Sequence, residues 1–213
     1  MSSFTEPTAM ELASLIVSKT CHDIISPVGA ASSAMEMWTE SNDESTREVA
    51  QTLMQKSSSH AVHKLAFVRI AYGAYGDVGG DVDLGEAKDA AEPYLTDDRT
   101  TFTWSLERMI VPKTVARLVL GLLALGKEAI PRGGALSIEG QDMPGAAKLA
   151  IRAEGAKVII PNGAEDALSL RFGDGVHARN VHLYHLVKTA QAVGVRIEPD
   201  MSDDALTLRT IPA

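Results

Sequence analysis

The feature that most constrains the fold is a long stripe of apolar and small residues near the N-terminus. The stripe recurs at alternating steps of four and three, through Met10, Ser14, Val17, Cys21, Ile24, Val28, Ala31, Met35 and Trp38. This heptad spacing keeps one face of an α-helix against a partner, as in helical bundles. The capping box Thr8-Ala9-Met10-Glu11 predicts that the helix begins near Ala9.

A second stripe predicts a helix that returns alongside the first. The segment 39–43 is polar and turn-forming, and Ser41-Asn42-Asp43-Glu44 offers a second capping box. Steps of four and three then lead through Met54, Ser58, Ala61, Leu65, Val68 and Tyr72. A glycine cluster follows, and it predicts a domain boundary near residue 80: Gly73, Gly76, Gly79 and Gly80. Because one helix pair cannot bury two stripes, we expect the hairpin of residues 1–80 to form a homodimeric four-helix bundle.

Residues 81–213 change to a mixed α and β pattern. We expect helices over 84–95, 113–129 and 180–193, with Pro112 opening the second of these as a first-turn proline. Strands are expected at 100–106, 135–139, 149–153, 157–160, 195–198 and 205–209. This order of elements predicts an α/β sandwich of two layers around one core.

The composition excludes several classes of function. The 213 residues carry 28 acidic side chains against 20 Lys and Arg, and this net charge of −8 argues against a nucleic-acid surface. No apolar run approaches the ~20 residues that a membrane span requires, and the N-terminus does not resemble a signal peptide. The single Cys21 cannot form an internal disulfide. We therefore expect a cytoplasmic protein without a nucleic-acid or membrane partner.

His22 is the residue most suited to act as a nucleophile. A neutral imidazole is a competent nucleophile near pH 7. The residues that share its helix face are mostly small, so they leave the ring open to a docking partner, with Ile25 as an apolar anchor: Ser18, Ile25, Ser26, Gly29 and Ser33. Cys21 belongs to the neighbouring stripe, and we expect it to be buried in the bundle.

Two residues beside His22 add to its interest. Asp23 either accepts a hydrogen bond or a proton from the ring, or is a surface acid on a solvated helix, and both interpretations remain open. Pro27 removes the hydrogen-bond partner of the Asp23 carbonyl, so we expect the helix to bend there.

Arg69, near the end of the second helix, either reaches a partner's acidic pocket or is a solvated charge. The pairs His60/His63 and His182/His185 have a spacing that metal ligands use, but neither has an evident third ligand.

The run His22-Asp23-Ile24-Ile25-Ser26-Pro27 matches the phospho-acceptor box H-[DE]-x-x-[ST]-P of sensor histidine kinases. The stretch 21–30, together with 129–134, is closer still to the histidine phosphotransferases of alphaproteobacterial cell-cycle phosphorelays. This resemblance covers essentially the whole chain. It implies an α + α/β fold, in which residues 81–213 form a degenerate α/β sandwich like the ATP-binding domain of histidine kinases.

The kinase pattern fails in the second domain. The asparagine box of the kinases, N-L-x-x-N-A, is replaced by Gly121, Leu125 and Gly126 at its two asparagines and its alanine. The segment 178–186 lacks the glycine-rich lid motif, and Phe172-Gly173-Asp174-Gly175 is better interpreted as a surface turn. The resemblance therefore implies a phosphotransferase that does not bind or hydrolyse ATP.

The resemblance also implies partners and roles. His22 would accept a phosphoryl group from the receiver-domain aspartate of a hybrid histidine kinase and pass it to response-regulator receiver domains. The protein would have no cofactor or metal of its own, and the receiver would supply Mg²⁺. Ser18, Ile25, Ser26, Gly29, Ser33 and Arg69 are the predicted partner-binding residues. Two alternatives remain, an ATP-dependent sensor-type kinase and a non-catalytic module that sequesters response regulators.

Overall fold

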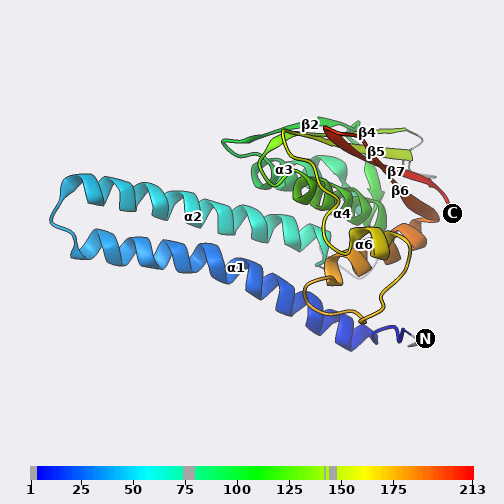
Figure 1. Ribbon diagram of the computed structural model, residues 1–213, viewed down its shortest axis with the longest axis horizontal. Helices are drawn as coiled ribbons and strands as arrows, with labels where there is room; N and C mark the ends of the chain where they lie inside the picture. Colours follow the sequence, from blue (N-terminus) through cyan, green and yellow to red (C-terminus); the bar gives the residue numbers. More distant parts are fainter. Residues whose placement is uncertain (1–3, 74–79, 142, 144–147) are drawn as a thin grey trace.

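Two long antiparallel helices extend from one side of a mixed α/β domain, which gives the molecule an elongated shape (Figure 1). They are α1 (Ala9–Glu40) and α2 (Glu44–Ala71). The computed structural model describes residues 4–73, 80–141, 143 and 148–213. Within these residues, none of the helices combines the length and the apolar character that crossing a membrane requires.

The two long helices begin at different kinds of cap. At α1 the predicted capping box is confirmed, because the Glu11 amide donates to the Thr8 hydroxyl (3.3 Å) and the Thr8 amide donates to the Glu11 carboxylate (2.8 Å). The second predicted box is wrong. Asp43 caps α2 by accepting from the Thr46 amide (2.9 Å), and Ser41 is the C-cap of α1. Hydrogen bonds from Ser45 and Thr46 lower the pKa of Asp43 to about 2, which keeps an anion at the positive end of α2.

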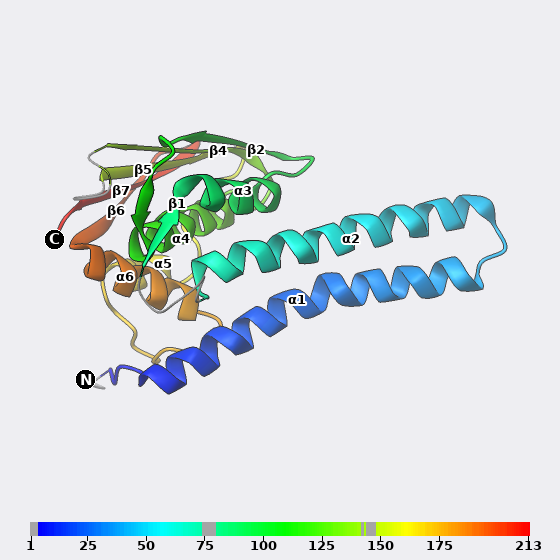
Figure 2. The same cartoon turned by 180° about the vertical axis from the view of Figure 1, so that it is seen from behind.

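The second domain is a mixed sheet with helices on one face. Its five-stranded sheet has the order β2-β4-β5-β7-β6, in which β2 and β4 are parallel and the other neighbours antiparallel, while β1 and β3 form a small antiparallel ribbon. Helices α3, α4 and α6 cover the same face of the sheet (Figures 1 and 2). The predicted α + α/β class is therefore confirmed. The elements are β1 (Asp81–Asp83), α3 (Leu84–Leu95), β2 (Thr100–Ser105), β3 (Ile110–Pro112), α4 (Lys113–Ala129), β4 (Gly134–Gln141), β5 (Lys148–Glu154), α5 (Ala164–Leu168), α6 (Val181–Val193), β6 (Val195–Met201) and β7 (Ala205–Pro212).

Most of the predicted elements of this domain are confirmed to within a few residues, but the strand expected at 157–160 is wrong. This apolar run covers the end of α4 without pairing in the sheet: the Ile159 amide donates to the Ala129 carbonyl (2.9 Å), and Val158 and Ile160 pack against the core. The short elements β1, β3 and α5 were not predicted, because three to five residues carry too little periodicity. The domain boundary near residue 80 stays a prediction, and Gly76 and Gly79 of its glycine cluster lie outside the described residues.

Helix α4 lies at the centre of the core, and two glycines allow its neighbours to approach closely. A Cβ at Gly121 would lie 2.9 Å from Leu186 Cδ1 of α6, and one at Gly126 would lie 2.9 Å from Leu136 Cδ1 of β4. Leu125, which lies between these two glycines in the sequence, is buried as well. The positions that correspond to the asparagine box of the kinases are therefore packed against other parts of the domain.

The N-terminal segment ties α1 to the second domain. Phe4 packs against Phe172 (ring centroids 5.4 Å apart) and Tyr184 (6.3 Å), and the Glu6 carboxylate pairs with Lys188 Nζ at 3.0 Å. The predicted turn at 172–175 is confirmed by a hydrogen bond from the Gly175 amide to the Phe172 carbonyl, although the Phe172 ring itself is buried in the core. Because α2 packs on α3 and α4, both helices of the hairpin are held against the domain.

The close packing of α4 on α6 can be tested with the residue that kinases carry. We expect Gly121→Asn to lower the free energy of unfolding by about 1–3 kcal/mol, because the new side chain must displace Leu186 in a filled core. Urea denaturation measures this change. As the control, Gly29→Ala on exposed α1 should raise stability by about 0.5–1 kcal/mol, since helix propensity alone changes there. An unchanged midpoint for Gly121→Asn would contradict the packing described here.

Candidate functional site

His22 is presented to solvent on α1, with a side chain that is 88% exposed. The neighbours predicted for its face are exposed as well, and at about 100° per residue they occupy an arc of about 100° on the helix: Ser18, Ile25, Ser26, Gly29 and Ser33. Ile25 is 69% exposed, and among the described residues a Cβ at Gly29 would meet nothing within 4 Å. The structure thus brings these residues together on an open face, and their role in docking stays a prediction.

Helix α1 continues through Pro27 without interruption. In both ribbon views its N-terminal part slopes away from α2, so the two helices diverge toward the second domain (Figures 1 and 2). This change of direction agrees with the bend predicted from the missing backbone donor. The result is that the two helices are most closely paired beyond the bend, toward the turn at 41–43.

Asp23 is the centre of a small polar network between the two helices. Its carboxylate contacts His22 Nδ1 at 3.4 Å, Lys19 Nζ at 2.6 Å and Lys64 Nζ at 3.3 Å. The Asp23 side chain is 18% exposed, so it is not a fully solvated surface acid, and its chemical role stays a prediction. The 3.4 Å contact to the ring is long for a hydrogen bond.

The charges around Asp23 keep it ionised. Burial raises the pKa of Asp23, but a hydrogen bond from Lys19 and the charges of Lys64 and Lys19, helped by the hydrogen bond from His22, outweigh burial and lower it below the ordinary value. An ionised carboxylate accepts hydrogen bonds only, so the ring nitrogen that faces it must carry the proton. The arrangement therefore favours the Nδ1–H form of His22, in which Nε2 carries the free lone pair.

The sequence interpretation missed both lysines. Lys19 precedes Asp23 by four residues, and this i,i+4 spacing was a readable signal for an ion pair on one helix. Lys64 belongs to the facing helix, and its meeting with Asp23 depends on the register between α1 and α2, which the two patterns alone do not give.

Arg69 and Cys21 lie on another side of the hairpin. They line a mostly apolar groove of about 380 Å³ between α1 and α2, together with Val17, Val68 and Tyr72 among others. In the single chain Cys21 is exposed, which contradicts burial within one hairpin; its burial in an assembled bundle stays a prediction. The structure does not bring Arg69 together with the face of His22.

The heptad stripe of α1 also remains open. Val17, Val28 and Met35 are 60%, 52% and 53% exposed, and Leu65 of α2 is 48% exposed. Val28 is turned by about 120° around the helix from His22, because the two are six residues apart. The apolar stripe and the face of His22 are thus separate surfaces of one helix.

The other histidines have partners of a different kind. His60 packs near the Tyr94 ring (centroids 6.2 Å apart), and burial lowers its pKa. His182 Nε2 lies 3.5 Å from Glu128, and burial lowers the pKa of His185 to about 4. Over the described ranges, no group of three or more His, Cys, Asp or Glu side chains could hold a metal ion. That the protein has no metal of its own stays a prediction.

Comparisons with known proteins define the class of this protein. Residues 84–205 match the family described as "Histidine phosphotransferase C-terminal domain". Protein phosphotransferase ChpT of Brucella abortus (strain 2308) is 34% identical over 196 residues, which cover 89% of this chain and 90% of that protein. A solved structure titled as that of a bacterial phosphotransferase matches with a TM-score of 0.89 and 29% identity, over 98% of this chain and 100% of that chain.

These similarities mark the chain as a protein phosphotransferase. It belongs to the histidine phosphotransferase family, whose members act in phosphorelays with kinases and response regulators. The histidine kinase AdeS of Acinetobacter baumannii matches with a TM-score of 0.43 and 13% identity, over 89% of this chain and 96% of that chain.

The network around Asp23 predicts a pH-dependent contribution to stability. We expect Asp23→Asn to lower the free energy of unfolding at pH 7 by roughly 1 kcal/mol, because the ion pairs with Lys19 and Lys64 are lost. Since the pKa of Asp23 is lower in the folded protein than its ordinary value of 3.8, the stabilisation is present above that value. It is lost as the pH falls through the folded pKa.

Urea denaturation of both proteins at neutral and acidic pH measures this effect. Asp98→Asn is the matched control, because Asp98 also pairs with a lysine of α2 (Lys56, 3.0 Å) but is 88% exposed. We expect this control to change stability little at either pH. An equal loss for the two variants at pH 7 would refute a special role for the Asp23 network.

Proposed function

We propose that His22 is the residue on which this protein carries a phosphoryl group within a multistep phosphorelay. The donor is an aspartyl phosphate on the receiver domain of a hybrid histidine kinase, and the acceptors are aspartates of response-regulator receiver domains. The observation that carries the proposal is the exposed imidazole of His22 beside the ionised, lysine-bound carboxylate of Asp23.

The transfer follows from this geometry. The Nε2 lone pair of His22 attacks the phosphorus atom, an N–P bond forms, and the P–O bond to the receiver aspartate breaks with its electron pair staying on the aspartate. The ring becomes positively charged during the attack because the proton stays on Nδ1. Asp23, 3.4 Å away, stabilises that charge by accepting the Nδ1–H hydrogen bond. The reverse sequence delivers the group to the next receiver, and we expect the receiver to supply Mg²⁺ for both steps.

The face around His22 suits a receiver domain that must approach the ring closely. Serines and a glycine leave room for a backbone to approach, and Ile25 supplies one exposed apolar side chain that a docking partner can bury. We include Ser18, Ser26, Gly29 and Ser33 in this docking surface. Arg69, in the groove beside Cys21, contacts a receiver only if the partner extends around the hairpin.

The packing of α4 supports a protein that does not use ATP. In a kinase the asparagine box must present side-chain oxygen to a nucleotide-bound metal, but here Gly121 faces Leu186 and Leu125 is buried. The alternative function, an ATP-dependent kinase, would require side-chain oxygens at these positions, and Gly121 and Leu125 have none. Incubation with radiolabelled ATP alone distinguishes the two, since only a kinase would become labelled.

Labelling identifies the acceptor residue. Purified receiver domains charged with radiolabelled acetyl phosphate should transfer label to the wild-type protein, and we expect His22→Ala to reduce labelling by at least about 100-fold because the nucleophile is lost. His177→Ala removes another exposed histidine and should be labelled as wild type. Label that persists in His22→Ala would contradict the proposal. Binding of receivers without any transfer would instead favour the sequestering module.

We further propose that the exposed stripe of α1 pairs with a second copy to form a four-helix bundle. Four of its apolar residues, Met10, Val17, Val28 and Met35, are more than half exposed in the single chain, and the groove beside Cys21 continues the same surface onto α2. A soluble helix rarely leaves such a stripe open along its length. Two hairpins joined by a two-fold axis would bury it on both copies.

Charge placed in the stripe tests the dimer. We expect Val28→Lys to weaken dimerisation by about 100-fold or more, because symmetry removes the burial of a valine twice. Analytical ultracentrifugation measures the change. Ile25→Lys is the matched control, since Ile25 is also an exposed apolar residue of α1 (69%, against 52% for Val28) but lies on the face of His22; it should leave the dimer intact and weaken receiver binding. Dissociation of the dimer by Ile25→Lys, with Val28→Lys unaffected, would reverse the assignment of the two faces.

A further inference from the structure

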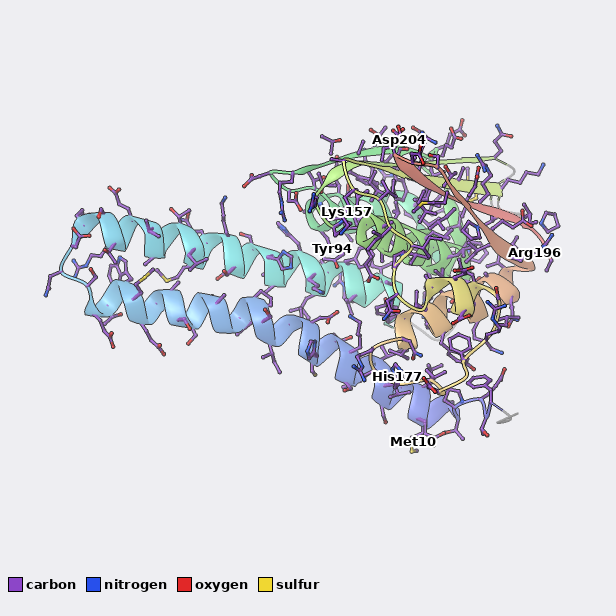
Figure 3. The ribbon with its side chains drawn as sticks, in the orientation of Figure 1. Met10, Tyr94, Lys157, His177, Arg196 and Asp204 are labelled. Atoms are coloured by element: carbon purple, nitrogen blue, oxygen red, sulfur yellow. The ribbon has the colours of Figure 1, made fainter. Side chains whose placement is uncertain are left out.

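Lys64 is a partly buried lysine that connects the first helix with the second domain. Its side chain on α2 is only 17% exposed, and its Nζ lies 3.3 Å from Asp23 Oδ2 of α1. On the other side the same Nζ lies 5.8 Å from the centroid of the Tyr94 ring, which belongs to α3. Figure 3 labels Tyr94 where the second domain meets the hairpin. A desolvated ammonium group needs compensating partners, and here one comes from each part of the protein.

The Tyr94 ring is itself held in place. It packs against the Phe67 ring with centroids 4.7 Å apart, and against the His60 ring at 6.2 Å. Burial raises the pKa of Tyr94 to about 12, so the phenol is neutral at physiological pH and the ring face is a fixed partner for a cation. The second domain therefore supplies a packed aromatic ring on the far side of Lys64.

Lys64 also changes the charge next to His22. A carboxylate alone beside the ring would repel an incoming phosphoryl group, which is an anion. With Lys19 at 2.6 Å and Lys64 at 3.3 Å, two ammonium groups surround the one carboxylate of Asp23. The group next to His22 is then cationic as a whole, while Asp23 keeps the lone pairs that accept the Nδ1–H of the ring.

The two lysines differ in what they depend on. Lys19 and Asp23 are on the same helix, four residues apart, so their pair forms whatever the second domain does. Lys64 must be brought to Asp23 from α2, and on its far side it is in contact with Tyr94. A change in how the second domain packs on α2 therefore affects Asp23 through Lys64 and not through Lys19.

We propose that Lys64 and Tyr94 are positioning residues for phosphoryl transfer at His22. The second domain holds Lys64 through the Tyr94 ring, Lys64 holds Asp23, and Asp23 holds the ring of His22 in the Nδ1–H form with Nε2 free to attack. This inference rests on the proposed function of His22. It gives the α/β domain a part in the transfer that requires no nucleotide.

Transfer rates test the chain of contacts. We expect Lys64→Met and Tyr94→Leu each to slow transfer from a receiver domain charged with radiolabelled acetyl phosphate by about tenfold. Tyr94→Phe keeps the ring face and should transfer at the wild-type rate. Lys56→Met is the matched control, because Lys56 lies on the same helix and pairs with Asp98 of the second domain at 3.0 Å, in an exposed contact. It should also transfer at the wild-type rate.

A double variant tests whether Tyr94 acts through Lys64. If it does, Lys64→Met with Tyr94→Leu is no slower than either single variant. A double variant slowed by the product of the two single effects would overturn the link between Tyr94 and Lys64.

The tautomer of His22 provides a readout that loss of stability does not move. Nitrogen NMR of the ring in the full-length protein should show a smaller fraction of the Nδ1–H form in Lys64→Met and Tyr94→Leu, and an unchanged fraction in Lys56→Met. An unchanged tautomer and rate in Lys64→Met would overturn the positioning role. This measurement needs no phosphoryl donor, so it decides the inference separately from the proposed function, which fails if label does not depend on His22.

Discussion

The register between α1 and α2 is the constraint on which the site depends. The turn at 41–43 joins a helix that ends at Glu40 to one that Asp43 caps, so it fixes how far each residue lies from the end of the hairpin. Asp23 comes 18 residues before Ser41, and Lys64 comes 21 residues after Asp43, which places them at similar heights on facing helices. A single inserted residue in α2 would rotate Lys64 by about 100° and remove it from Asp23. The cap at Asp43 thus contributes to the meeting of Asp23 and Lys64, because it fixes where α2 begins.

The central helix of the second domain, α4, is surrounded by close packing. Glycines at 121 and 126 bring α6 and the sheet against α4, and the surrounding positions are filled with leucine and valine. The same domain contacts the hairpin at two places, through Phe4 and Glu6 near the start of α1 and through Tyr94 beside α2. These two contacts hold the hairpin against the second domain at two separate places.

Local patterns predicted much of this fold, and contacts across the chain account for the rest. The capping box at Thr8, the helix over 84–95 and the face of His22 follow from spacing within one element, which the sequence displays directly. The strand expected at 157–160 was wrong because an apolar run indicates burial and not the kind of element that is buried. Asp43 replaced Ser41 as a cap because both residue types cap helices well. The partnership of Lys64 with Asp23 and Tyr94 joins three helices, and no spacing in the sequence encodes it.

The two open faces of α1 differ in chemistry, and this difference suits the permanent and the transient contact that we propose for them. The stripe of Val17, Val28 and Met35 is apolar and leads into the groove beside Cys21. Its exposure to water is therefore unfavourable whether or not a receiver is bound. The face of His22 is made of serines, a glycine and one isoleucine, and it tolerates water when no partner is bound. Because Val28 lies about 120° from His22 around the helix, a second copy bound to the stripe would leave His22 uncovered. Under the proposed function, one helix would therefore hold a dimer together and still exchange receivers, provided that the two surfaces stay chemically distinct.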